Sequence, residues 1–223
     1  MLKLHNVSVY FKNKTGLFDI NLSIEKGEFM YLVGPTGAGK TTLLRSIYMD
    51  LPLDNGTIEF AGYNSSSIKR RQIPYLRRQI GNVFQDLKLL DDRTVFDNVI
   101  FALRSAGATS RDAKKKAVKA LTGVGLFSRR NNRLEELSGG ELQRLCIARA
   151  IANQPQIILA DEPTGNLDPG TARSIFELLH KLNQRGITIL TATHNYQIIS
   201  EFPGRVVYLN NGRIQNRPEP EGR

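Results

Sequence analysis

The chain contains the stretch Gly34-Pro35-Thr36-Gly37-Ala38-Gly39-Lys40-Thr41-Thr42, which fits the phosphate-binding pattern G-x-x-x-x-G-K-[ST] at every fixed position. An unbroken apolar run, residues 29–33, precedes it and predicts a buried strand, and residues 42–47 are typical of the start of a helix. Glycines let the backbone curl so that its N–H groups point at phosphate oxygens, and a helix N-terminus adds a favourable potential. We expect Lys40 to reach the β- and γ-phosphates and the Thr41 hydroxyl to ligate Mg²⁺. Residues 34–42 are therefore predicted to be a nucleotide-binding loop, which we call the phosphate loop.

With 223 residues, the chain is long enough for one large α/β domain or for one domain with an inserted subdomain. Its hydrophobic share of 40% and charged share of 23% are ordinary for a globular protein that buries a core. No stretch approaches about 18 uninterrupted apolar residues, so the sequence predicts no transmembrane helix. Cys146 is the only cysteine, which excludes an internal disulfide and fits a reducing cytoplasm. We expect it to be a small buried group on a helix.

The net charge of +10 comes largely from three clusters of basic residues. Nucleotide phosphates would occupy only a few of these side chains. A basic surface can dock beside an anionic membrane or an acidic partner, it can bind nucleic acid, or it can simply be solvated. Tyr75 is the single aromatic residue within the clusters, which is too few for the stacking platform that single strands require, so we favour a membrane-proximal position and expect no nucleic-acid partner. The clusters are Lys69, Arg70, Arg71, Arg77 and Arg78; Arg111, Lys114, Lys115, Lys116 and Lys119; and Arg129, Arg130 and Arg133.

The residues before the phosphate loop predict two strands and an aromatic contact for the base of the nucleotide. Apolar residues alternate from Leu2 to Phe11 and again from Leu22 to Ile24. Phe11 lies about two dozen positions ahead of the loop, where a base could stack on it. Tyr10, on the opposite face of the strand, is the alternative, and ordinary core packing competes with both.

The middle of the chain changes from strands to helices. Asn55-Gly56 predicts a turn before a short alternating strand, and Ser65–Arg78 predicts a basic helical stretch. A further apolar strand, residues 80–84, leads to the polar amide of Gln85. From about residue 87 to 137 the strand patterns stop and apolar residues recur at four-residue steps, which predicts an inserted helical subdomain.

Strands and helices alternate again in the last third of the chain. Residues 137–141 precede a helix with one apolar face, and the predicted strand at residues 157–162 ends in two carboxylates. Asp168-Pro169 predicts the start of the next helix, with the aspartate as its N-cap and the proline at its first position. His194 follows a strand at residues 187–191. The chain then ends in a predicted hairpin, residues 205–215 with a turn at Asn211-Gly212, and in a tail, residues 217–223, that we expect to be disordered.

Four polar positions follow four of the predicted strands. Strands that alternate with helices form a parallel sheet, and ligands bind outside the carboxyl ends of its strands. Asp161 would hold Mg²⁺, directly or through water, opposite Thr41. Glu162, one residue further on, is placed to take a proton from an attacking water. The four positions expected to converge on one nucleotide are Gly34, Gln85, Asp161 and His194.

The order of these motifs resembles that of ABC-type ATPases over residues 1 to about 216. The most specific motif is Leu137-Ser138-Gly139-Gly140, the signature of that superfamily, although Glu141 stands where the family more often has glutamine. The resemblance implies an α/β fold, namely a P-loop NTPase domain of the ABC type over residues 1–223, with an antiparallel β subdomain and the helical insertion. The other matching motifs are the phosphate loop, Gln85, Ile157–Glu162, Gly165-Asn166-Leu167-Asp168 and His194.

The resemblance also implies a head-to-tail homodimer that sandwiches two ATP molecules, each with Mg²⁺. One subunit's phosphate loop and the other subunit's signature would hold each ATP, which fits isologous pairing about a two-fold axis. His194 would contact the γ-phosphate, and Gln85 would bridge Mg²⁺ to the helical subdomain. The expected catalytic residues are Lys40, Glu162 and His194, and the expected metal ligands are Thr41, Gln85 and Asp161. The expected nucleotide contacts are Phe11, Gly34, Pro35, Thr36, Gly37, Ala38, Gly39, Lys40, Thr41, Thr42, Gln85, Ser138, Gly139 and Gly140.

The segment Arg77–Val99 is similar to the cell-division group of these ATPases, and Asp92-Arg93-Thr94-Val95-Phe96-Asp97-Asn98-Val99 is its most characteristic phrase. That group acts with an FtsX-like membrane protein and signals to cell-wall hydrolases, which implies a peripheral position on the cytoplasmic face of the plasma membrane. ATPases of lipoprotein release and of MacB-type efflux are the alternative within the superfamily. A P-loop kinase would need a phosphoacceptor site, and DNA-associated ABC ATPases usually carry long coiled coils that this chain lacks.

Overall fold

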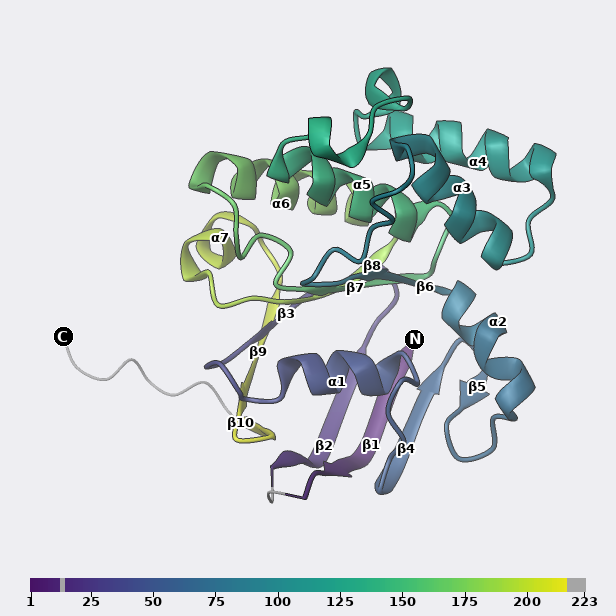
Figure 1. Cartoon of the computed structure of the whole chain (residues 1–223). Helices are drawn as coiled ribbons and strands as arrows, with labels where there is room; N and C mark the ends of the chain where they lie inside the picture. Colours follow the sequence, from purple (N-terminus) through teal and green to yellow (C-terminus); the bar gives the residue numbers. More distant parts are fainter. Residues whose placement is uncertain (13–14, 216–223) are drawn as a thin grey trace.

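The computed structural model describes residues 1–12 and 15–215, which form two sheets with helices around them (Figure 1). One sheet has four strands in the order β2-β1-β4-β5, and the other has six in the order β10-β9-β3-β8-β7-β6. The strands are β1 (Leu2–Tyr10), β2 (Gly16–Ile24), β3 (Phe29–Val33), β4 (Asn55–Phe60), β5 (Tyr63–Asn64), β6 (Ile80–Val83), β7 (Ile157–Asp161), β8 (Thr188–Ala192), β9 (Arg205–Asn210) and β10 (Arg213–Gln215). The α-helices are α1 (Lys40–Ile47), α2 (Ile73–Arg78), α3 (Val95–Ser105), α4 (Ser110–Gly123), α5 (Gly139–Ile151), α6 (Pro169–Gln184) and α7 (Tyr196–Glu201), with short 3-10 turns η1 (Arg70–Gln72), η2 (Phe127–Arg129) and η3 (Leu134–Glu136).

The six-stranded sheet is the centre of the fold. Its strands β9, β3, β8, β7 and β6 pair in parallel, and β10 adds an antiparallel edge. Every residue of β3, β7 and β8 is buried, as expected for parallel strands that are covered on both faces. The parallel sheet predicted from the alternation of strands and helices is therefore confirmed.

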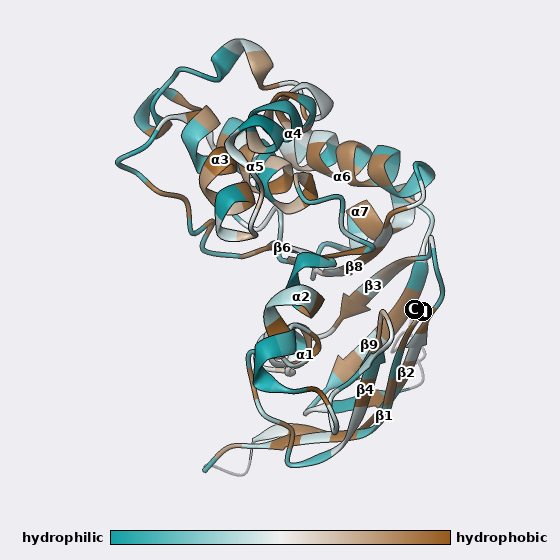
Figure 2. Ribbon diagram, turned by 90° about the vertical axis from the view of Figure 1, so that its right-hand side faces the viewer, coloured by the Kyte–Doolittle hydropathy of each residue, from teal (hydrophilic) through white to brown (hydrophobic). Residues whose placement is uncertain are grey.

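Alternate side chains of this sheet enter two separate cores. In β3, Tyr31 packs among the helices α3 to α7, whereas Met30 and Leu32 pack with α1 and the antiparallel sheet. Figure 1 shows α1 between the two sheets, and α3, α4, α5 and α6 together on the far side of the six-stranded sheet. Figure 2 shows the same separation from the side, with the helical layer at one end and the antiparallel sheet at the other.

The antiparallel sheet corrects one expectation from the sequence. Asn55-Gly56 is not a hairpin turn, because both residues belong to β4, which pairs with β1. Gly56 has a φ of +81° and lies opposite an irregularity in β1, where Asn6 is also left-handed. A Cβ on Gly56 would collide with the Asn6 carbonyl, so the glycine is required for a bulge and not for a turn.

Two further boundaries differ from the prediction. The second strand is much longer than Leu22–Ile24, because β2 starts at Gly16 and pairs along the whole of β1. The basic helix begins only at Ile73, after the 3-10 turn η1, and does not include Ser65–Ser67. Those serines belong to an Asx-type turn, in which the Asn64 side chain accepts hydrogen bonds from the backbone N–H and the hydroxyl of Ser66.

The last third of the chain agrees closely with the sequence patterns. The Asp168 side chain caps α6 by accepting from the Thr171 N–H, and Pro169 is the first residue of the helix. The predicted hairpin is formed by β9 and β10, and Cys146 is fully buried on α5. The tail, residues 217–223, lies outside the described residues.

The segment 87–137 contains α3 and α4, whose N-caps are Thr94 and Thr109. Both helices pack on α5 through small and branched apolar residues, so this segment is continuous with the core above the sheet. The boundaries of a separate helical subdomain stay a prediction.

Over the described ranges, 1–12 and 15–215, no helix has the length and apolar character needed to cross a membrane.

Candidate nucleotide-binding site

The phosphate loop is fixed between β3 and the closing hairpin. Gly34 has a φ of +152°, and a Cβ there would collide with the Leu209 carbonyl of β9. The Gly212 N–H, in the hairpin turn, donates to the Ala38 carbonyl at 2.9 Å. Gly39, in the left-handed region at a φ of +106°, is the N-cap of α1. The loop therefore needs these glycines because the backbone passes close to β9 and then turns sharply into the helix.

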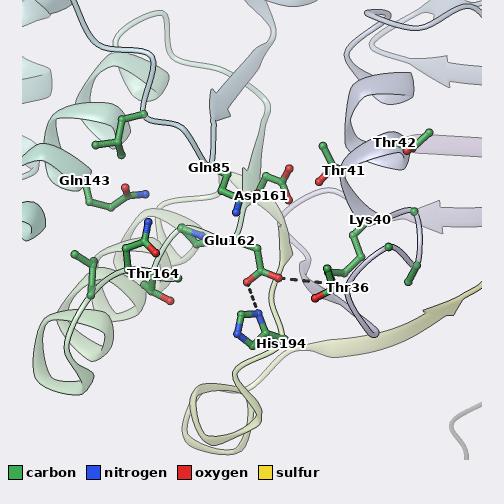
Figure 3. Close-up of a pocket in the computed structure, with 18 of the residues that line it drawn as sticks. Thr36, Lys40, Thr41, Thr42, Gln85, Gln143, Asp161, Glu162, Thr164 and His194 are labelled. Atoms are coloured by element: carbon green, nitrogen blue, oxygen red, sulfur yellow. Dashed lines mark hydrogen bonds and ion pairs between the residues drawn. The ribbon is translucent and has the colours of Figure 1, made fainter. Parts of the chain in front are cut away.

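A cavity of about 530 Å³ opens in front of this loop and is the candidate site (Figure 3). Its size is that of a typical small-molecule pocket. It lies at the carboxyl ends of β3, β6, β7 and β8 and extends to α5. Most of the predicted site residues line it, namely Thr36, Gly37, Ala38, Gly39, Lys40, Thr41, Thr42, Gln85, Gly139, Asp161, Glu162 and His194.

Lys40 supplies a positive charge beneath the loop. Its ammonium group donates to the Gly34 carbonyl at 2.7 Å and to the Pro35 carbonyl at 3.2 Å. It also lies 3.7 Å from the Glu162 carboxylate, and only 8% of the residue is exposed. The ammonium is thus held by acceptors that phosphate oxygens can replace.

Glu162 connects two other groups of the site. Its carboxylate accepts a hydrogen bond from His194 Nδ1 at 3.0 Å and faces Lys40 on the other side (Figure 3). The backbone of Glu162 is left-handed, with a φ of +45°, and its N–H donates to the Ala192 carbonyl at the end of β8. A non-glycine residue in this region is strained, and such strain is found where a side chain must be aimed at a site.

Asp161 is the buried carboxylate at the end of β7. Only 8% of the residue is exposed, and its Oδ1 atom has no hydrogen-bond partner among residues 1–12 and 15–215. Burial raises the pKa of this carboxyl, and the neighbouring Thr41 hydroxyl acts in the opposite direction. A buried acceptor without a donor is suited to a cation, because a metal ion supplies the missing positive partner.

The residues around Asp161 fit Mg²⁺ rather than a metal that needs a full set of protein ligands. Within the described ranges, no three histidine, cysteine, aspartate or glutamate side chains gather closely enough to hold a metal ion. Mg²⁺ is typically bound by one or two protein oxygens together with waters and substrate phosphates. The Asp161 carboxylate and the Thr41 hydroxyl are such oxygens.

Five predicted residues lie outside the lining of this cavity. Gly34 and Pro35 stand behind it and contact Lys40 through their carbonyls. Ser138 caps α5, where it forms a reciprocal pair with Glu141, and Gly140 packs against Thr171. Phe11 is 41% exposed, just beyond the end of β1, and its role in binding the base stays a prediction.

The structure also adds residues to the site that the sequence patterns did not single out. Gln143, on α5, and Thr164, after β7, line the same cavity. Both are buried polar residues. Gln143 could have been noticed as a polar residue among apolar neighbours on the inner face of a predicted helix, although its environment depends on how the helices pack.

The fold and the site define an ABC-type ATPase. A family model described as "ABC transporter" matches residues 17–165. Among curated proteins, the chain is 45% identical over 216 residues to the cell division ATP-binding protein FtsE of Streptococcus pneumoniae (97% of this chain, 94% of the relative). It is 43% identical to FtsE of Mycobacterium tuberculosis (96% and 94%) and 42% identical to FtsE of Escherichia coli (96% and 97%). The chain belongs to the ABC transporter family and, within it, to the cell division ATP-binding proteins named FtsE.

Solved structures confirm the expected fold class. The cassette MJ0796, in a dimeric post-hydrolysis state bound to ADP and Pi, matches with a TM-score of 0.86 and 33% identity, and each chain is covered fully. A second dimeric structure of MJ0796 gives a TM-score of 0.87 at 34% identity, again with full coverage. The cbiO1 protein of Clostridium perfringens gives 0.87 at 30% identity, covering 96% of this chain and 86% of that one.

Proposed function

We propose that this chain is the ATP-hydrolysing subunit of an FtsEX-like membrane complex that acts in cell division. The observation that carries the proposal is the Glu162 carboxylate, which lies between Lys40 and His194 at the mouth of the phosphate loop. This arrangement has a cationic anchor, a base and a residue that orients the base. Relatives named FtsE, at 42–45% identity over almost the whole chain, favour cell division over the exporter alternatives.

Binding begins at the phosphate loop. Lys40 exchanges the Gly34 and Pro35 carbonyls for phosphate oxygens, and the N–H groups of the loop and of the α1 N-terminus point at the same phosphates. Thr41 and Asp161 would hold Mg²⁺, and Gln85, which lines the same cavity, would complete the set of protein ligands. When bound, the metal neutralises phosphate charge and orients the phosphates for displacement.

Hydrolysis depends on Glu162. Its carboxylate accepts a proton from the water that attacks the γ-phosphate, and His194 keeps the carboxylate oriented through its 3.0 Å hydrogen bond. Lys40 stabilises the charge that develops on the phosphate oxygens. The left-handed backbone of Glu162 fixes the carboxylate in advance, so little reorganisation is needed at the moment of reaction.

The active form is a homodimer in which each ATP is shared. Ser138 and Gly139 begin α5, whose N-terminus is a second anion-binding element. One phosphate loop already saturates the phosphates within a chain, so the signature is free to bind the ATP of the opposite subunit. The dimeric ABC cassettes of similar fold support this arrangement.

Closure of the dimer would be transmitted to an FtsX-like protein in the membrane and, through it, to cell-wall hydrolysis. The chain would then lie at the cytoplasmic face of the plasma membrane, held there by its partner. Two features support this position, namely the +10 net charge and the similarity to FtsE proteins.

The test compares Glu162→Gln with Lys40→Ala in the full chain. Glu162→Gln should lower turnover by about 10²–10⁴-fold, retain ATP and accumulate as a dimer in light scattering, because only the base is lost. Lys40→Ala should bind ATP about 10–150-fold more weakly, since it loses a charge-assisted contact worth about 1.5–3 kcal/mol, and should stay monomeric. ATP-loaded Glu162→Gln protein should also capture an FtsX-like protein from its own membranes. Normal turnover in Glu162→Gln would remove Glu162 as the base.

A further inference from the structure

One face of α5 holds the segment that follows Gln85. The Arg149 guanidinium donates to the Leu87 carbonyl at 2.6 Å and also to the Lys88 carbonyl, and the Cys146 thiol donates to Leu87 at 3.4 Å. Leu87 and Lys88 are both left-handed, with φ near +48° and +49°. Two consecutive non-glycine residues in this region are strained, and the contacts from α5 offset that strain.

Gln143 lies one step nearer the signature on the same helix. Positions 143, 146 and 149 are spaced by three residues, so Gln143 continues the row formed by Cys146 and Arg149. Only 5% of Gln143 is exposed, yet its side-chain amide makes no hydrogen bond with any described residue, and its Nε2 atom is fully enclosed. Of these three side chains, Gln143 is therefore the one without a hydrogen-bond partner among the residues that the structure describes.

The matching group stands across the cavity. Gln85 lines the same cavity as Gln143, and its side-chain amide also makes no hydrogen bond within the described ranges. Figure 3 shows the Gln143 amide directed into the cavity on the side of Gln85. Each amide has a donor and an acceptor, so the two side chains can satisfy one another.

A buried amide without a partner costs free energy, and an apolar side chain of similar size would be more stable there. Gln143 thus lowers the stability of the nucleotide-free protein. That free-energy cost is removed when another polar group forms a hydrogen bond with the Gln143 amide. Gln85, which is exposed and next to the strained turn held by α5, is the group placed to arrive.

We propose that Gln143 is a positioning residue that hydrogen-bonds the Gln85 side chain when Mg²⁺ and nucleotide draw Gln85 into the cavity. The contact joins the metal side of the site to α5, the helix that begins with the signature. Occupancy of one subunit's site thereby fixes the orientation of the signature that it presents to the other subunit. The inference rests on the proposed function, because it needs Gln85 to move toward the bound Mg²⁺ and ATP.

Gln143→Met tests the contact in the full chain, with Gln184→Met as the matched control, because Gln184 is exposed on α6 and does not line the cavity. Without nucleotide, Gln143→Met should melt at the same temperature as wild type or slightly higher. With Mg²⁺ and ATP, its gain in melting temperature should be smaller than in wild type, and turnover should fall about fivefold, the worth of one hydrogen bond. Hydrogen exchange of residues 84–90 should slow on adding Mg²⁺ and ATP in wild type and in Gln184→Met, but not in Gln143→Met.

A double-mutant cycle with Gln85→Met identifies the partner. Gln143→Met should add no further loss in the Gln85→Met background, because the contact is already absent there. Additive losses, or unchanged exchange and turnover in Gln143→Met, would overturn the inference while leaving the proposed function intact. A lower melting temperature of nucleotide-free Gln143→Met would assign the residue a purely structural role and would also overturn it. Failure of the wild-type chain to bind or hydrolyse ATP would instead remove the proposed function.

Discussion

Replacing the buried carboxylate of Asp161 by an amide should raise the stability of the protein without nucleotide. It should also reduce the further stabilisation that Mg²⁺ and ATP provide. No described residue donates a hydrogen bond to the Asp161 Oδ1 atom, and burial already raises the pKa of the group, so the charged form is unfavourable there. An unsatisfied buried acceptor costs about 1–3 kcal/mol, and more when it is charged. Asp161→Asn removes the charge but keeps the shape, so we expect it to recover about 1–2 kcal/mol. For a chain of this length, that corresponds to a rise in melting temperature of about 2–8 °C.

Thermal unfolding of wild type and Asp161→Asn, first in EDTA without nucleotide and then with Mg²⁺ and ATP, measures both effects. Asp161→Asn should melt higher in EDTA, whereas the increase caused by Mg²⁺ and ATP should be large only in wild type. Asp86→Asn is the control, because this exposed carboxylate lies near the same site and its loss should move the melting temperature by only about 1–2 °C. If Asp161→Asn melts below wild type in EDTA, the carboxylate has a stabilising partner in the empty site and the reasoning is refuted.

Three other changes test separate parts of the structure. Ser138→Arg should abolish most turnover while changing the ATP affinity of the monomer less than about twofold, because the signature acts on the other subunit's nucleotide. Isothermal titration measures the affinity and a steady-state assay measures the turnover. A large loss of monomer affinity would contradict the shared site. Burial lowers the pKa of His180, so the folded state binds the proton of this side chain more weakly than the unfolded state does. The free energy of unfolding should therefore fall as the pH drops below about 6.5. Urea titrations at pH 5, 6 and 7.5 should show this loss in wild type and a flatter profile in His180→Phe. Gly34→Ala should prevent formation of the phosphate loop, because the added Cβ would collide with the Leu209 carbonyl. Gly37 has a φ of +80° but open space around it, so Gly37→Ala should lower the free energy of unfolding by only about 1 kcal/mol in urea titrations. Equal effects would show that backbone conformation alone matters at both positions.

The sequence alone predicts the parts of this fold that depend on local patterns. The apolar run before Gly34 and the Asp168-Pro169 start of α6 could both be assigned because a buried strand and a capped helix have short, specific signals. The polar groups at the strand ends were predicted to converge because parallel strands share one carboxyl edge, and Gln85, Asp161 and His194 do line one cavity.

Features that depend on a distant partner were missed or misassigned. The pair Asn55-Gly56 is typical of a hairpin turn, yet pairing with β1 makes it part of a bulge. The pattern from Ser65 onward predicts a helix, but the Asn64 side chain offers the Ser66 N–H another hydrogen-bond partner. Gln143 carries little local signal, since its lack of a partner arises only when α5 packs against the Gln85 segment.

The position of β3 has a consequence for the order in which the protein matures during synthesis. Both neighbours of β3 in the sheet come from the last quarter of the chain, and Phe29 pairs with Ile189 about 160 residues later. The Ala38 carbonyl of the phosphate loop accepts its hydrogen bond from the Gly212 N–H, and Gly212 is synthesised later still. Contacts between such distant residues form late, because the intervening chain must first be made and ordered. The earliest motif to be translated is therefore among the last to become functional, and a nascent chain that is still incomplete should not consume ATP.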